Sequence, residues 1–158
     1  MASYTKKLAP VANPHLQQGE VLLAAVRGMS KGATKGIVGG TAGMVAGGAL
    51  GAILGGRAGN DDRAAGEAQA RDAGLGDLPP QLALGLTDRR LLVFSRSAVS
   101  GKAKDLVGEI PRDRIAEIEG KDLGKLSPNR LTVHLTDGTA VDFEVVRIDG
   151  YQTIVEAY

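Results

Sequence analysis

The sequence predicts a mainly β, α+β protein: a small antiparallel barrel or sandwich with a C-terminal helix and an inserted glycine-rich helical hairpin. Three observations support this fold class. Short apolar alternations separated by turn residues fill the second half of the 158-residue chain, as is typical of antiparallel strands. The final stretch YQTIVEAY carries apolar side chains at helical spacing. An uncharged run from Ile37 to Gly56 precedes most of the strands.

Composition excludes several classes of function. The chain has 19 basic and 18 acidic side chains and a net charge of +1, so no global field recruits nucleic acid, and none is predicted as a partner. Cysteine is absent, which excludes disulfides and thiolate metal sites and fits a reducing cytosol. No paired acid and base, phosphate-binding loop or metal-ligand cluster stands out. We therefore expect a protein that is not an enzyme and has no cofactor or metal.

The first segments of the chain differ in character. Residues 1–16 are predicted to be a flexible tail, because Lys6 and Lys7 are followed by prolines and not by the apolar core of a signal peptide. The stretch EVLLAAVR from Glu20 fits a buried strand or a short helix, and the strands that follow favour a strand. Residues 60–80 are predicted to be a polar, alanine-rich helix or helical linker, with Asn60 as N-cap and GLGDLPP as the stop signal.

The remaining residues predict two hairpins, two further strands and a closing helix. QLALGLT and RLLVFSR form the first hairpin, in which Asp88, Arg89 and Arg90 are interpreted as turn residues. DLVGEIP and RIAEIEG are short strands between turns. LTVHLT and AVDFEVV form the second hairpin around Asp137-Gly138, with His134 on its polar face.

These stretches together resemble a bacterial pleckstrin-homology-like (YokE/GRAM-like) domain. The resemblance is carried by GEVLLAAVRG, by LALGLTDRRLLVFSRS, and by KDLVGEIPRDRIAEIE with LTVHLTDGTAVDFEV. It implies a domain made of residues 17–28 and 81–158, with 29–59 and 60–80 inserted between its first two strands. Lipid-binding members tend to use the loop between these strands, which basic residues flank here too. That loop is far longer in this chain, so no phosphoinositide pocket is inferred.

Residues 29–59 are predicted to form a glycine zipper. Glycine recurs at every fourth position, which brings these residues close to one side of a helix and lets another backbone approach. The predicted helix-packing residues are Gly39, Gly43, Gly47, Gly51 and Gly55. The predicted membrane- or lipid-contact residues are Lys31, Lys35, Ile37, Val38, Val45, Leu50, Ile53, Leu54 and Arg57.

The uncharged run is a marginal membrane segment. Its length would cross a ~30 Å hydrocarbon layer, but its strongly apolar side chains contribute only roughly 2 to 4 kcal/mol. If the flanking strands pair in one sheet, both ends of the run must emerge on the same side of the membrane. A re-entrant or interfacial hairpin that bends near Gly47-Gly48 satisfies this requirement. A flexible linker and a soluble buried helical hairpin remain open alternatives.

The leading hypothesis is a non-catalytic, membrane-associated binding or scaffolding protein on the cytoplasmic face, anchored or oligomerised through the glycine run. Its expected partners are membrane lipid, further copies of the chain and an unidentified protein. The alternative is a soluble cytoplasmic structural protein that self-assembles through the same run without lipid. The loop from Ser95 to Asp105 carries Arg96, Lys102 and Lys104. It is interpreted as an ordinary solvated loop, with contact to anionic head groups as the alternative.

Overall fold

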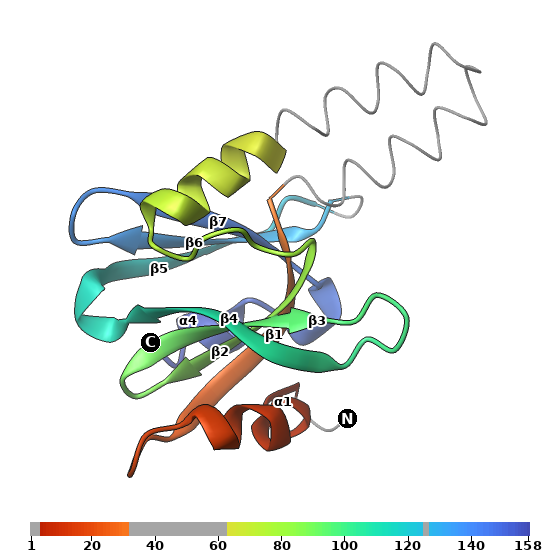
Figure 1. Ribbon diagram of the computed structural model, residues 1–158. Helices are drawn as coiled ribbons and strands as arrows, with labels where there is room; N and C mark the ends of the chain where they lie inside the picture. Colours follow the sequence, from red (N-terminus) through yellow and green to blue (C-terminus); the bar gives the residue numbers. More distant parts are fainter. Residues whose placement is uncertain (1–3, 32–62, 125–126) are drawn as a thin grey trace.

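The structure, a computed structural model, describes residues 4–31, 63–124 and 127–158 (Figure 1). In these residues seven strands form one antiparallel sheet in the order β4-β3-β2-β1-β7-β6-β5. The strands are β1 (Leu22–Ser30), β2 (Gln81–Thr87), β3 (Arg90–Arg96), β4 (Ala103–Pro111), β5 (Ile115–Lys121), β6 (Asn129–Leu135) and β7 (Ala140–Val145). The helical segments are α1 (Tyr4–Ala12), η1 (Asn13–His15), residues 63–72, η2 (Arg112–Arg114), η3 (Arg147–Asp149) and α4 (Gln152–Val155).

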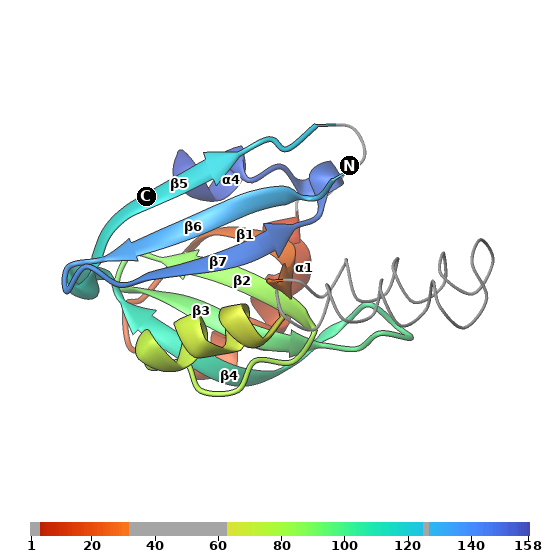
Figure 2. The ribbon, with the colours of Figure 1, turned by 90° about the horizontal axis from the view of Figure 1, so that it is seen from above.

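The sheet folds back on itself at β1. This strand pairs with β2 along most of its length and with β7 only from Gly28 to Ser30. Figures 1 and 2 show the result, in which β2, β3 and β4 form one layer and β5, β6 and β7 form the other. The predicted mainly β, antiparallel architecture is therefore confirmed for the described residues.

The hairpin of β6 and β7 shows the alternation that predicted it. Leu131 and Val133 face inward and pair with Phe143 and Val141, while the residues between them face outward. The turn at Asp137-Gly138 has Gly138 at a φ of 88°, a conformation that suits glycine. This hairpin lines the main core with one face only, so its sequence alternates.

The hairpin of β2 and β3 is apolar on both faces because it separates two cores. Leu91 and Val93 enter the main core between the layers, and Leu92 and Phe94 enter a second core on the outer side. Helix α1 covers this second core. The double burial explains why RLLVFSR is a continuous apolar run and not an alternation.

The predicted flexible tail is wrong for residues 4–12, which form α1. Tyr4, Leu8, Val11 and Ala12 recur at helical spacing and pack on the outer core, and the side chain of Leu8 is completely buried. Pro10 lies inside the helix and removes one backbone donor. Burial of the apolar stripe outweighs that loss.

The predicted polar helix is present at residues 63–72, but it is more than a linker. Gly74, at a φ of 82°, ends it in a Schellman motif in which Leu75 donates its N–H to the Ala70 carbonyl at 2.8 Å. Ala70, Ala73, Leu75 and Leu78 then enter the main core. Part of residues 60–80 therefore belongs to the β domain, which corrects the predicted domain boundary.

The predicted C-terminal helix is confirmed as the short α4. Ile154 is buried in the main core, and Tyr151, Val155 and Tyr158 pack around it. The ring of Tyr151 lies on Gly120 of β5, where a Cβ would stand 1.9 Å from the ring. Glycine at position 120 is therefore needed for α4 to dock in this position.

The predicted glycine-zipper segment, 29–59, begins two residues too early, because Met29 and Ser30 belong to β1. Its residues 32–59 lie outside the described residues, so the helical hairpin stays a prediction. Among the described residues, no helix is long and apolar enough to cross a membrane.

Candidate functional site

The two ends of the inserted segment meet at one point, which we call the root. It consists of Lys31 at the end of β1 and Gly66 in the first turns of helix 63–72. A Cβ at Gly66 would lie 2.7 Å from Lys31 Cβ and 3.1 Å from the Lys31 carbonyl oxygen. Figure 1 shows the end of β1 and the start of this helix together at the top of the domain. Glycine is therefore required for the two ends to approach so closely.

The root is held by an ion pair. Lys31 Nζ lies 2.9 Å from Asp142 Oδ2 on β7, and Thr132 of β6 donates its hydroxyl to Asp142 Oδ1 at 2.7 Å. Burial raises the pKa of Asp142, but the hydrogen bonds from Thr132 and Lys31 and the charges of Lys31 and Arg130 outweigh it, so the pKa is below its usual value. Asp142 is thus ionised at neutral pH and fixes Lys31 to the sheet.

The chain re-enters the sheet beside the point where it left. Ser30 donates its N–H to the Pro80 carbonyl at 3.1 Å, and Met29 pairs with Gln81 at the start of β2. The root, the end of β1 and the start of β2 therefore form one continuous platform.

A second ion pair stiffens β1 below this platform. Arg27 binds Asp149 of η3 through two side-chain contacts, of 2.7 Å from Nε and 2.8 Å from Nη2. The Arg27 backbone N–H also donates to Asp149 Oδ2 at 2.9 Å, and the Arg27 guanidinium lies 5.5 Å from the Tyr4 ring centroid. The hydrogen bond to Asp149 raises the pKa of Arg27 above its ordinary value. This arrangement links α1, β1 and η3.

The β3–β4 hairpin lies at the same end of the sheet as the root. Antiparallel connections alternate between the two ends of a sheet, so the β1-to-β2 and β3-to-β4 connections share an end. Figures 1 and 2 both show this hairpin projecting from the side where helix 63–72 begins. Its tip carries Val99, with Arg96, Lys102 and Lys104 beside it.

The opposite end holds a buried ionic cluster. Arg90 donates to Glu20 through Nε at 2.9 Å and Nη2 at 2.9 Å, and Thr87 donates to Glu20 Oε1 at 2.7 Å. The Gln17 N–H donates to Glu20 Oε2 at 2.7 Å. The hydrogen bonds from Arg90 lower the pKa of Glu20 to about 2. A carboxylate so fully engaged stabilises the fold and is unsuited to proton transfer near neutral pH.

Of the predicted site residues, only Lys31 falls within the described part of the chain. The helix-packing glycines and the other membrane-contact residues, from Lys35 to Arg57, lie outside it. Lys31 lies at the root, where its charge is paired with Asp142; its contact with membrane lipid stays a prediction. His134 is on the surface, with Nε2 3.4 Å from Glu119. Asp88 and Arg89 are exposed turn residues, whereas Arg90 is buried and was missed.

Among the described residues, no cluster of three or more histidine, cysteine or acidic side chains has the arrangement of a metal site. The ionised pairs described above bind their partners within the protein. The contact of Lys31 with Gly66 and the pairing of β1 with β2 fix where the inserted segment leaves and rejoins the antiparallel β domain.

Comparison with known proteins gives a fold-level resemblance. No protein-family model and no curated protein matches the chain in sequence. The chain is similar in structure to a DUF1696 family protein with a pleckstrin-homology domain from Shewanella loihica PV-4, at 12% identity and a TM-score of 0.47. The match covers 97% of this chain and 88% of that chain. Its low identity means that it assigns no function.

Proposed function

We propose that this protein is a non-catalytic, membrane-associated binding or scaffolding protein. Its pleckstrin-homology-like domain is anchored or oligomerised through the glycine-rich insertion between β1 and β2. The observation that carries the proposal is the contact between Lys31 and Gly66 at the root.

This contact restricts how the insertion can meet a membrane. A single crossing would place Lys31 and Gly66 on opposite sides of a hydrocarbon layer ~30 Å thick. Their backbones are in contact, so a segment that enters the membrane must leave it on the same side. Two helical arms of about ten residues would reach ~15 Å each, which suits a re-entrant or interfacial hairpin. Close packing of the arms through the glycine ladder would cover the exposed backbone.

The non-catalytic part of the proposal is supported by the acids of the domain. Glu20, Asp142 and Asp149 are each bound by a basic side chain, and Glu20 and Asp142 have lowered pKa values. The lowered pKa values make Glu20 and Asp142 weak bases, and their engagement with basic partners favours a structural role.

The alternative function is soluble self-assembly through the same segment. The root presents both ends of the insertion on one side of the domain, so the glycine ladder could equally meet copies from other chains. The small apolar content of the run, worth roughly 2 to 4 kcal/mol in a bilayer, favours this alternative.

Membrane fractionation with carbonate washing and detergent extraction tests the proposal. The full chain should stay in the washed pellet and dissolve in detergent. A matched variant replaces residues 32–62 by a glycine-serine linker of about four residues, which is enough to bridge the root. This variant should fold and be released. A full chain that is soluble without detergent, and unchanged by the replacement, would contradict membrane association.

Two further measurements separate the proposal from its alternative. Size-exclusion chromatography without detergent should show discrete oligomers for soluble self-assembly, and aggregation or loss for a membrane segment. Substitution of Gly43, Gly47 and Gly51 by leucine should disrupt close helix packing while it raises hydrophobicity. Assembly that survives this change would refute the zipper, even if membrane binding persists.

A further inference from the structure

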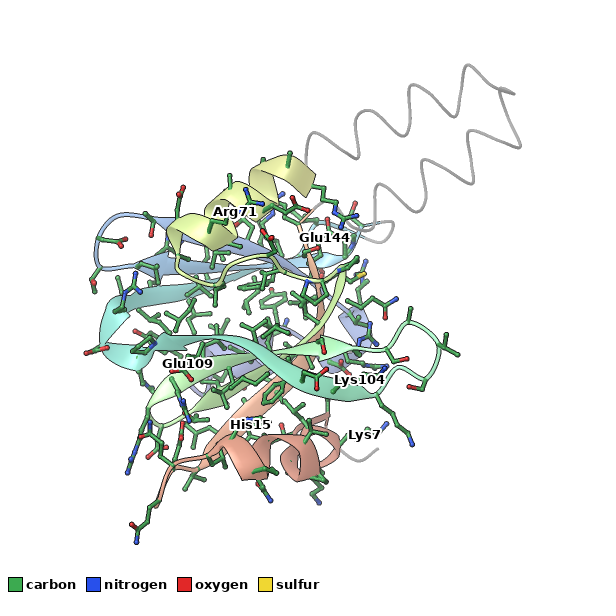
Figure 3. The ribbon with its side chains drawn as sticks, in the orientation of Figure 1. Lys7, His15, Arg71, Lys104, Glu109 and Glu144 are labelled. Atoms are coloured by element: carbon green, nitrogen blue, oxygen red, sulfur yellow. The ribbon has the colours of Figure 1, made fainter. Side chains whose placement is uncertain are left out.

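The outer core is an apolar sheet face that a separate helix covers. Leu92 and Phe94 of β3 are completely buried in it, beside alanines of β1 and β2. Helix α1 covers this face with an apolar stripe, in which Leu8 is also completely buried. Figures 1 and 3 show α1 as a separate element on the outer side of the layer of β2, β3 and β4, with the exposed Lys7 on it. The sheet therefore has a helix-binding face, which a segment of its own chain occupies.

Helix α1 is weak by its own sequence. It has nine residues, and it has no acid in its first turn and no base in its last turn to suit the helix dipole. A helix of this length is marginal in isolation. Pro10 lacks the N–H that would bond to the Lys6 carbonyl, and it is exposed and takes no part in the outer core. The contacts of α1 with the sheet therefore have to stabilise the helix as well as hold it in place.

The chain that follows α1 is anchored to the domain independently of the helix. Arg90 Nη2 donates to the His15 carbonyl at 2.7 Å, and the His15 ring lies edge-on to Phe94 with 5.7 Å between the ring centroids. Asn13 and Pro14 lie between this anchor and α1. The helix can therefore leave the outer face while the chain that follows it stays bound.

An arginine beside the first turn of α1 lacks an acidic partner. Burial raises the pKa of Tyr4, and the nearby charge of Arg96 acts against this rise. Arg96 Nε is buried without a hydrogen-bond partner, and Arg96 forms no ion pair among the described residues. A helix with an acid at the position of Tyr4 would pair with Arg96 and place negative charge where the helix dipole favours it.

We propose that the outer face of the sheet is a docking site for an amphipathic helix of a partner protein, and that α1 is its autoinhibitory cover. The partner helix has apolar residues at the positions of Leu8, Val11 and Ala12, an acid at the position of Tyr4, and no interior proline. It repeats the apolar contacts of α1, and it adds an ion pair and the backbone hydrogen bond that Pro10 removes. This partner is bound by the β domain itself, so the inference depends neither on the insertion nor on a membrane.

Fluorescence anisotropy of a labelled peptide tests the inference. The peptide is the sequence of α1 with Tyr4→Glu and Pro10→Ala, followed by an alanine- and lysine-rich tail of about eight residues, which makes it long enough to form a helix. It is titrated with the full chain, with Leu8→Ala, which weakens the cover, and with Pro10→Ala, which strengthens it. Lys6→Ala is the matched control on the exposed side of α1. Circular dichroism verifies that each variant is folded.

The peptide should bind Leu8→Ala about 30-fold more tightly than wild type, which corresponds to about 2 kcal/mol less competition from α1. Pro10→Ala should bind it more weakly than wild type, and Lys6→Ala should bind it equally. In the Leu8→Ala chain, Arg96→Met should remove the preference for this peptide over one that keeps Tyr4.

Equal binding by all chains, or no binding by Leu8→Ala, would overturn the inference. If Leu8→Ala does not fold, the comparison of wild type with Pro10→Ala decides: tighter or equal binding by Pro10→Ala contradicts a cover that competes with the peptide. Self-association of Leu8→Ala that excludes the peptide would assign the face to a second copy of the chain and would likewise overturn the inference.

Discussion

Replacement of Glu20 by glutamine should destabilise the fold by about 3 kcal/mol at neutral pH. The carboxylate is completely buried as a side chain and accepts hydrogen bonds from Arg90, Thr87 and Gln17. Its pKa falls from 4.5 to about 2 in the folded protein. Each pKa unit corresponds to about 1.4 kcal/mol, so the shift accounts for about 3 kcal/mol. Loss of one partner of a buried ion pair typically costs about as much.

The sign of the pH dependence follows from the lowered pKa. Between about pH 5 and pH 2 the unfolded chain binds a proton at Glu20 and the folded chain does not, so stability falls as pH falls. Above this range the stabilisation is fully present. Glu20→Gln lacks the titrating group, so its stability should approach that of wild type as the pH nears 2.

Chemical denaturation followed by circular dichroism, at several pH values, measures both effects; the chain has no tryptophan for fluorescence. Glu109→Gln is the matched control. Glu109 binds the same Arg90, but its side chain is 45% exposed, so its loss should cost under about 1 kcal/mol. A difference between wild type and Glu20→Gln that stays constant from neutral to acid pH would refute the charge-based argument.

Three further predictions concern the packing of the domain. Leu8→Ala should lower the free energy of unfolding by about 2 to 5 kcal/mol, because Leu8 anchors α1 in the outer core. The control Lys6→Ala should lower it by far less. Chemical denaturation measures both, and equal effects would contradict a docked α1. Gly120→Ala should cost about 1 to 3 kcal/mol because its methyl group meets the Tyr151 ring, and a double-mutant cycle with Tyr151→Ala should show strong coupling. Asp142→Asn should increase hydrogen exchange at Lys31, because it removes the charge that fixes this lysine; unchanged exchange would argue against that role.

The sequence was sufficient for the parts of the fold that rest on local pattern. The hairpin of β6 and β7 combines period-two alternation with an Asp-Gly turn, so it could be predicted with its approximate bounds. The end of helix 63–72 was equally visible, because glycine at position 74 supplies the left-handed residue of a helix stop.

Features that depend on distant residues could not be predicted in the same way. The partner of Arg90 is Glu20, which is 70 positions away, and nothing in the turn sequence indicates it. Helix α1 contains a proline and has few residues, so only the second apolar face of the sheet explains its stability. The continuous apolar run RLLVF indicated that both faces of β3 are buried, but the sequence did not indicate that α1 covers the second face.

The candidate site also combines one feature that the sequence predicted with one that it did not. The expectation that the insertion leaves and returns on one side came from pairing its flanking strands, and the pairing of β1 with β2 agrees with it. The close contact that Gly66 permits could not be inferred, because it depends on where helix 63–72 packs.

The most direct test of the central claim is the sidedness of the insertion. The chain has no cysteine, so single cysteines at Thr34, Asn60 and Ser97 can be labelled with a membrane-impermeant maleimide in right-side-out and inverted vesicles. All three positions should react from the cytoplasmic side only. Reaction of positions 34 and 60 from opposite sides would contradict an insertion that returns to its root.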